Sequence, residues 1–141
     1  PPRSTLFPYT TLFRSLYVAG GSGKAPIKSM LEHLKEVGTN RKMTYFFGAR
    51  TTKDLYLTEE MQAFEQVFNE FEYVPVLSQS SPEENWAGKT GLIMPYFKDA
   101  IRDPKNTEAY LCGSPGMISA VTKALKENGV EDNKIYYDSF G

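Results

Sequence analysis

The sequence is poor in the residues that build disulfides, metal centres and membrane spans. Its 141 residues include one cysteine, Cys112, and one histidine, His33. A lone cysteine excludes an internal disulfide, and it excludes the cysteine-rich sites that hold zinc or iron–sulfur clusters. No apolar run approaches the roughly 18 residues that a membrane helix needs. A chain of this length buries roughly two-thirds of its unfolded surface, so one hydrophobic core is enough to fold it.

Concentrated charge of either sign is also missing. The 16 Lys+Arg and 17 Asp+Glu residues nearly cancel, to a net charge of −1, and they form no basic block. Proteins that bind nucleic acid or anionic membranes need clustered Lys and Arg, which displace the counterions of the phosphates. The composition therefore predicts one soluble domain, cytoplasmic, with no nucleic-acid partner and no metal ligands.

The first fifteen residues differ in composition from the rest of the chain. They contain no acidic residue, three of the nine prolines, and the tripeptide Thr-Leu-Phe twice. Residues 5–15 (TLFPYTTLFRS) resemble the in-frame translation of a common sequencing adapter. We therefore interpret residues 1–15 as an artefact, disordered or extended, and expect the folded domain to comprise residues 16–141. The alternative is a genuine edge strand or extended tail.

From Leu16 onward, short β-like runs alternate with amphipathic helical runs. Five runs rich in β-branched, aromatic or aliphatic residues predict strands: 16–19 (LYVA), 43–47 (MTYFF), 72–77 (EYVPVL), 109–112 (AYLC) and 134–137 (KIYY). Pro75 has no backbone N–H to donate, which favours an edge or irregular position for the third strand.

Apolar side chains spaced by three and four residues predict helices between the strands. The stripes are Ile27, Met30, Leu31, Leu34 and Val37; Met61, Phe64, Phe68 and Phe71; and Met117, Ile118, Val121 and Leu125. A further short helix is expected to begin near Pro95, after a loop over residues 78–90. This alternation predicts an α/β fold, a doubly wound five-stranded parallel sheet of order 3-2-1-4-5 with helices on both faces.

Two segments follow strands at the edge where such a sheet binds ligands, the carboxyl ends near the reversal of strand order. They are Gly20-Gly21-Ser22-Gly23 after the first strand and Cys112-Gly113-Ser114-Pro115 after the fourth. The first continues to Pro26 as a G-x-G-x-x-P pattern. Glycines let the backbone approach a phosphate, and a helix N-terminus presents free amides, so a diphosphate is the expected guest. The alternative is a tight strand-to-helix turn.

Six segments in order and spacing resemble the nucleotide-binding domain of the ferredoxin–NADP reductase-type flavoproteins. They are residues 16–30, 45–57, 73–78, 84–93, 109–118 and 135–141. The similarity is greatest to NADH-oxidising members with a plant-type iron–sulfur domain, such as the F subunits of sodium-translocating NADH:quinone reductases and oxygenase reductase components. The resemblance implies a module that binds NADH and passes a hydride to FAD, from which electrons continue to a [2Fe–2S] cluster and a quinone, oxygenase or ferredoxin acceptor.

The resemblance also assigns roles at the adenosine and diphosphate end of the cofactor. Arg50 would meet the adenosine half, although a surface ion pair with Asp54 is the alternative. Gln79 stands where NADPH-dependent relatives tend to place arginine, which implies a preference for NADH. The residues expected around the diphosphate are Gly20, Gly21, Ser22, Gly23 and Pro26.

At the other end, Cys112 and Gly113 resemble the Cys-Gly pair beside the nicotinamide, where the thiol holds the hydride donor against the flavin. Cys112 is thus the candidate catalytic residue, and Ser114 continues the cofactor-binding segment. Phe140 matches the near-terminal aromatic residue that stacks on the flavin. The alternatives are a small buried hydrophobe at Cys112 and a core aromatic residue at Phe140.

The family's flavin-binding barrel and four-cysteine cluster have no counterpart in this sequence. We therefore expect a C-terminal fragment of a larger reductase, inactive alone, whose partners are the missing FAD-binding and iron–sulfur domains and whose intact form is membrane-associated on the cytoplasmic side or free. An NADPH-dependent reductase of the same superfamily and a non-catalytic nucleotide-sensing domain stay open as alternatives.

Overall fold

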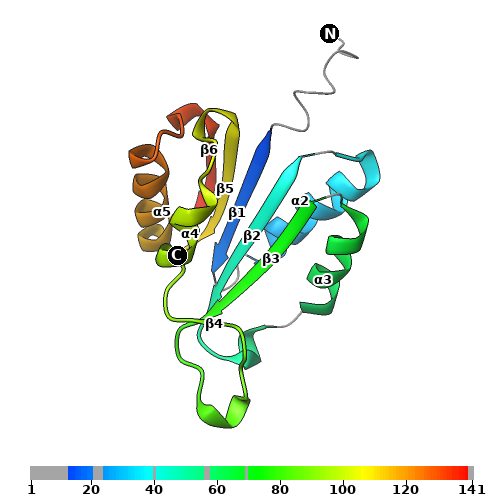
Figure 1. The fold of residues 1–141 in the computed structure, drawn as a ribbon, viewed down its shortest axis with the longest axis vertical. Coiled ribbons are helices and arrows are strands. Elements are labelled where there is room, and N and C mark those ends of the chain that lie inside the picture. Colours follow the sequence, from blue (N-terminus) through cyan, green and yellow to red (C-terminus); the bar gives the residue numbers. More distant parts are fainter. Residues whose placement is uncertain (1–12, 21–23, 40, 56–57, 69, 140–141) are drawn as a thin grey trace.

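The fold is described by a computed structural model, which covers residues 13–20, 24–39, 41–55, 58–68 and 70–139. Its centre is a six-stranded sheet in the order β4-β3-β2-β1-β5-β6, in which every neighbouring pair is parallel (Figure 1). The strands are β1 (Arg14–Gly20), β2 (Lys42–Ala49), β3 (Glu70–Leu77), β4 (Lys89–Thr90), β5 (Thr107–Gly113) and β6 (Ile135–Ser139).

The five strands and the order predicted from the sequence are confirmed, and β4 is an addition at the edge beyond β3. Its two residues pair with Val76 and Leu77, inside a segment expected to be loop. Two residues carry no periodicity that could have revealed them. Pro75 lies where a backbone N–H is not needed for pairing with β2. The Ser78 N–H donates to Ala49 of β2, and successive backbone N–H groups of a strand point to opposite sides, so position 75 faces the outer side of β3, as expected for an edge position.

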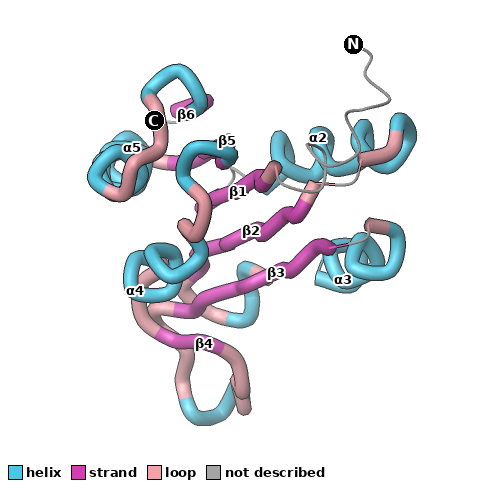
Figure 2. The backbone as a smooth tube through the Cα atoms, turned by 45° about the horizontal axis from the view of Figure 1, so that its top comes forward, coloured by secondary structure: helices cyan, strands magenta, loops and turns pink. Residues whose placement is uncertain are grey.

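The helices form a layer on each side of the sheet (Figure 2). They are α2 (Lys24–Val37), α3 (Thr58–Val67), α4 (Met94–Phe97) and α5 (Pro115–Glu127). The first two cover one face, and the last two cover the other. Gly38 and Gly129 follow α2 and α5 with φ of 82° and 98°, left-handed values that end a helix at little cost when the residue is glycine.

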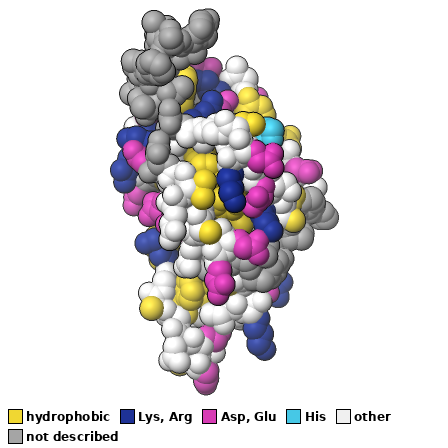
Figure 3. All heavy atoms as spheres, turned by 90° about the vertical axis from the view of Figure 1, so that its right-hand side faces the viewer, with side chains coloured by type: hydrophobic (Ala, Val, Ile, Leu, Met, Phe, Trp, Pro, Cys, Tyr) yellow, Lys and Arg dark blue, Asp and Glu magenta, His cyan; other side chains and the backbone are white. Residues whose placement is uncertain are grey.

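Each face has its own hydrophobic cluster because side chains alternate along every strand. The α2/α3 face is rich in aromatic residues, and the α4/α5 face is mainly aliphatic. On the outside of α2 and α3, acidic and basic side chains are interspersed, and Lys28 pairs with Glu60 across the two helices at 2.6 Å (Figure 3).

Three differences from the sequence expectation concern single residues at the ends of elements. Phe71, expected on the second helical stripe, lies in β3, because α3 ends at Val67, although its ring still packs into the same cluster. Val37 is 63% exposed, since it is the last residue of α2 and stands beyond the buried stripe. Strand β1 begins at Arg14, two residues before the expected start. The interpretation of residues 1–15 as an artefact stays a prediction, and residues 1–12 lie outside the described part.

Candidate functional site

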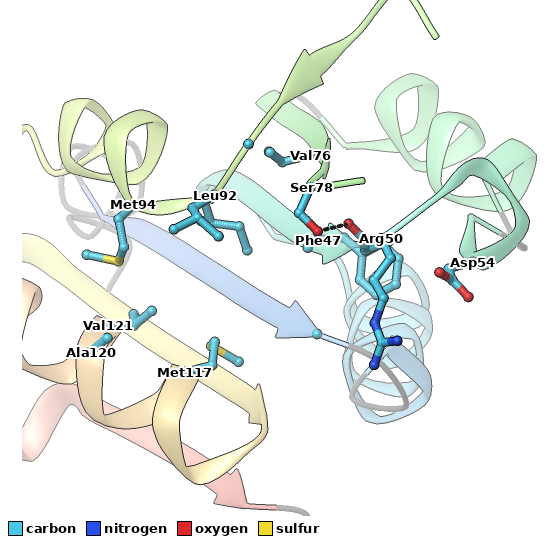
Figure 4. Close-up of a pocket in the computed structure, with 15 residues that line it drawn as sticks. Phe47, Arg50, Asp54, Val76, Ser78, Leu92, Met94, Met117, Ala120 and Val121 are labelled. Carbon is cyan, nitrogen blue, oxygen red and sulfur yellow. Dashed lines mark hydrogen bonds between the residues drawn. The ribbon is translucent and has the colours of Figure 1, made fainter. Parts of the chain in front are cut away.

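A cavity of about 620 Å³ opens at the carboxyl ends of β1, β2 and β3, on the α4/α5 face (Figure 4). This volume is within the range of small-molecule and cofactor sites. One wall comes from β2 and the segment that follows it, another from the segment entering α4, and a third from α5. The residues of these walls include Gly48, Arg50 and Asp54; Leu92, Ile93 and Met94; and Met117, Ala120 and Val121.

Glycines of three neighbouring strands lie side by side at this edge. Gly20 of β1 pairs with Gly48 of β2, and Gly113 of β5 is the next residue after the Ala19–Cys112 pair. A Cβ at Gly48 would come within 2.7 Å of Ile93 Cδ1, and one at Gly113 within 2.5 Å of Met117 Cε. Glycine at these two positions therefore leaves room for side chains that line the cavity.

Arg50 extends from the end of β2 at the open side of the cavity (Figure 4). Its backbone is held by the neighbouring strand: the Ser78 N–H donates to the Ala49 carbonyl at 2.9 Å, and the Gln79 N–H donates to the Arg50 carbonyl at 2.8 Å. The Asp54 carboxylate accepts the Thr51 N–H at 3.3 Å, and the salt bridges of the described residues do not join it to Arg50. The Arg50 guanidinium is thus available to an anionic or polar ligand.

Cys112 lies on the other side of the sheet from the cavity. Its side chain is 6% exposed and belongs to the cluster of the α2/α3 face. Burial raises the pKa of the thiol, and the negative charge of Asp138, its neighbour on β6, raises it further. The thiol is therefore protonated at neutral pH, which suits a packing contact and does not suit a thiolate nucleophile.

Ser114 begins α5 as its N-cap residue. The Ser114 Oγ accepts a hydrogen bond from the Met117 N–H at 3.3 Å, and Pro115 follows at the first helical position. The cap orients the first turn of the helix, from which Met117 reaches the cavity. The structure therefore gives Ser114 a local role in placing a cavity-lining residue.

The sequence-predicted site residues are placed unequally. Gly20 and Arg50 line the cavity, Gly113 adjoins it through Met117, and Cys112 faces away. Pro26 is half-buried in the first turn of α2. The predictions for Gly21, Ser22, Gly23 and Phe140 concern residues outside the described part of the chain.

The sequence reasoning missed the apolar lining. Leu92 is 71% exposed although it is a large hydrophobic residue, and Met94 and Met117 stand across the cavity from the strand ends (Figure 4). Residues 92 and 93 belong to a segment that carried the family resemblance, and that segment was the signal that could have found them. No local pattern distinguishes Met117 as a lining residue, because its spacing is that of a residue on the buried stripe of a helix.

Two other kinds of site are absent from the described residues. No three His, Cys, Asp or Glu side chains in that part of the chain gather as a metal site requires. Over the same residues, no helix has the length and apolar character needed to cross a membrane.

A family model and the sequences of known proteins identify the same family for this chain. A family model described as the oxidoreductase NAD-binding domain matches residues 17–123. The F subunit of the Na(+)-translocating NADH-quinone reductase of Psychrobacter cryohalolentis is 36% identical over 146 residues, with 99% of this chain and 35% of that relative covered. The chain thus spans about a third of the length of this relative.

Two solved structures with the same fold are named as reductases. The cytochrome P450 reductase GcoB of Amycolatopsis superposes with a TM-score of 0.81 at 24% identity, over 91% of this chain and 38% of that one. The ferredoxin reductase of a carbazole 1,9a-dioxygenase gives 0.76 at 25% identity, over 92% and 38%. These matches confirm the fold class and the family resemblance inferred from the six sequence segments.

Proposed function

This chain belongs to the oxidoreductase NAD-binding domain family, and from that premise we propose that it is the NADH-binding module of an FAD-dependent oxidoreductase. The observation that carries the proposal is the cavity, which extends from Arg50 across the glycine ends of the strands to Met117. It reaches the carboxyl end of β1, beside the point where strand order reverses, and this is where doubly wound sheets bind nucleotides.

The cavity suggests how the dinucleotide lies. The adenosine half is placed beside Arg50, whose planar guanidinium can stack on a base or bond an anionic oxygen. The diphosphate crosses the backbone at Gly20, and the nicotinamide half is directed toward Gly113, at the end of β5. The Cys112 thiol would act from behind this end: protonated and packed in the α2/α3 cluster, it would hold the end of β5 in place without taking up or releasing a proton.

When both cofactors are bound, NADH supplies a hydride and FAD accepts it. The residues of this chain would orient the dinucleotide for that reaction. They are the glycines at the strand ends (Gly20, Gly48 and Gly113), Arg50, and the first turn of α5, which Ser114 caps. The proposal includes FAD, a [2Fe–2S] cluster and a quinone, oxygenase or ferredoxin acceptor in the intact enzyme, outside this module. It also includes weak NADH binding and no redox turnover by the 141-residue chain alone.

The test compares Arg50→Ala with Lys53→Ala, a change of the same charge at an exposed residue that does not line the cavity. Removing Arg50 deletes a charged hydrogen-bond donor, so we expect NADH to bind the variant about tenfold more weakly. Lys53→Ala should stay within about twofold of the wild type. NMR titration measures both dissociation constants. A wild-type chain that binds no NADH contradicts the proposal, and tighter binding of NADPH than NADH would favour the NADPH-dependent alternative.

A further inference from the structure

The segment between β3 and α4 forms an outer wall of the cavity. It leaves the sheet after Leu77, extends beyond the strand ends and returns through β4 (Figure 1). The Gly91 N–H donates to the Leu77 carbonyl at 2.9 Å, which closes the loop at its base. Leu92 and Ile93 come next and line the cavity. The position of this wall therefore depends on what holds the loop.

Glu84 holds the loop through hydrogen bonds that both of its carboxylate oxygens accept. Its Oε1 accepts the backbone N–H of Thr52 at 2.7 Å and the Thr52 hydroxyl at 2.6 Å. Its Oε2 accepts the backbone N–H of Ser81 at 2.6 Å and the Ser81 hydroxyl at 3.2 Å. Two donors on each oxygen match the accepting capacity of a carboxylate. One side chain thus joins the loop to a turn that lies 32 residues earlier in the sequence.

The turn that Glu84 binds belongs to the opposite wall of the cavity. The 3₁₀ turn Thr52–Asp54 begins two residues after Arg50, and Asp54 within it also lines the cavity. Glu84 itself is not among the lining residues. Its carboxylate therefore fixes the separation of two walls, one bearing Arg50 and the other bearing Leu92, without reaching into the space between them.

We propose that Glu84 is a positioning residue for the adenosine half of the dinucleotide, acting through the Arg50 wall of the cavity. The inference rests on the proposed NADH-binding function and adds a determinant that lies outside the lining. Four accepted hydrogen bonds lower the pKa of Glu84 to about 2, so the carboxylate is ionised at every pH of an ordinary binding assay. The nicotinamide end is built by β5 and α5, and the four hydrogen bonds of Glu84 go to Thr52 and Ser81, in neither of these elements.

Glu84→Gln is the informative substitution because it keeps size and shape. The amide group replaces one accepting oxygen by a donor, so either the Thr52 pair or the Ser81 pair of donors loses its acceptor. The matched control is Glu83→Gln, an exposed residue of the same turn whose hydrogen-bond contacts stay within the loop. ADP-ribose is the probe, since it carries the adenosine and diphosphate and lacks the nicotinamide.

We expect Glu84→Gln to weaken ADP-ribose binding to the 141-residue chain about fivefold to tenfold, and Glu83→Gln to leave it within twofold. A double-mutant cycle with Arg50→Ala separates positioning from general damage. If Glu84 acts through Arg50, Glu84→Gln should change affinity less than twofold in the Arg50→Ala background, whereas independent effects would multiply. Dispersed amide resonances establish that each variant is folded, and Thr52→Val, which removes one of the donors, is the second variant.

The outcomes separate this inference from the proposed function. A wild-type chain that binds neither NADH nor ADP-ribose overturns the proposed function, and with it the ligand assigned to Glu84. Wild-type binding with unchanged affinity in folded Glu84→Gln and Thr52→Val overturns the role of Glu84 alone. Multiplying effects of Glu84→Gln and Arg50→Ala would also overturn it, because they would show that Glu84 does not act through the Arg50 wall.

Discussion

The two faces of the sheet are covered by helices of different length. On one face α2 and α3 have 14 and 10 residues, whereas on the other α5 has 13 and α4 has only four. A four-residue helix spans about 6 Å and cannot cover strands of seven or eight residues. The cavity lies at the strand ends that α4 leaves uncovered. The cavity thus results from one shortened crossover in an otherwise regular fold.

The side chains of the two faces differ accordingly. On the α2/α3 face, the rings of Phe64, Phe68 and Phe71 lie within 5.6 to 6.0 Å of one another and fill the space between α3 and β3. On the α4/α5 face, the cavity walls include methionine, glycine and alanine beside aliphatic side chains such as Leu92, Ile93 and Val121. Rigid aromatic packing closes one face, and small or adaptable side chains leave the other open.

Truncating the aromatic cluster should have the largest effect and should leave the ligand site intact. Phe64 is 3% exposed, so Phe64→Ala removes a buried ring and leaves a void, which costs about 3–5 kcal/mol of unfolding free energy. Urea denaturation measures the loss, and Glu65→Ala, at an exposed neighbour, should change stability by less than about 0.5 kcal/mol. If folded Phe64→Ala lost NADH affinity, the separation of a structural face from a binding face would be wrong.

How well the α2/α3 face excludes water can be tested through a row of tyrosines. Tyr17 stacks on Tyr110 at 5.2 Å, and Tyr110 stacks on Tyr136 at 5.2 Å, so the row runs from the centre of the sheet to its β6 edge. Tyr17 is 1% exposed, and burial raises its pKa from 10.0 to about 12. The native state therefore keeps the phenol proton at pH values where the unfolded chain has lost it.

That difference predicts a loss of stability in alkali. Tyr17 contributes its full stabilisation below pH 10, and the contribution falls as pH rises from 10 toward 12, by about 1.4 kcal/mol per pH unit for one proton. Tyr17→Phe keeps the stacked ring and removes the titrating group. Unfolding free energies between pH 9 and 11 should therefore fall less steeply in Tyr17→Phe than in the wild type. Equal slopes would mean that water reaches the Tyr17 hydroxyl.

Much of the fold could be predicted because hydrophobic periodicity records burial. The strands and the α2 and α5 stripes follow from side chains that one face of each element must bury. The strand order follows from the alternation of strands and helices along the chain. The assignment of Phe71 to β3 could not be predicted, since a buried aromatic residue is equally compatible with the end of a helix and the start of a strand. Strand β4 depends on a backbone pairing that its exposed side chains do not reflect.

The site was predictable only in part, and Cys112 shows why. Alternation along β5 puts Leu111 and Cys112 on opposite faces, which the sequence implies. The cavity lies on the face that the short α4 covers. No pattern in the sequence fixes the length of the helix near Pro95, so the side of the cavity could not be predicted. Arg50 was reached through the family resemblance. Glu84 was not reached, because its partner Thr52 is distant in sequence and their contact exists only in the folded chain.

The smallest expected effect concerns Leu92, whose exposure distinguishes a binding residue from a core residue. Leu92 is 71% exposed, and the control residue Val67, which lies outside the cavity at the end of α3, is 49% exposed. Leu92→Ala and Val67→Ala should therefore each change the unfolding free energy by less than about 0.5 kcal/mol. If a bound dinucleotide covers about 30 Å² of the Leu92 side chain, Leu92→Ala loses about 0.8 kcal/mol of binding, or roughly fourfold in affinity. Val67→Ala should bind NADH like the wild type. Equal NADH affinities in the two variants, measured by NMR titration, would show that the loop wall does not contact the ligand.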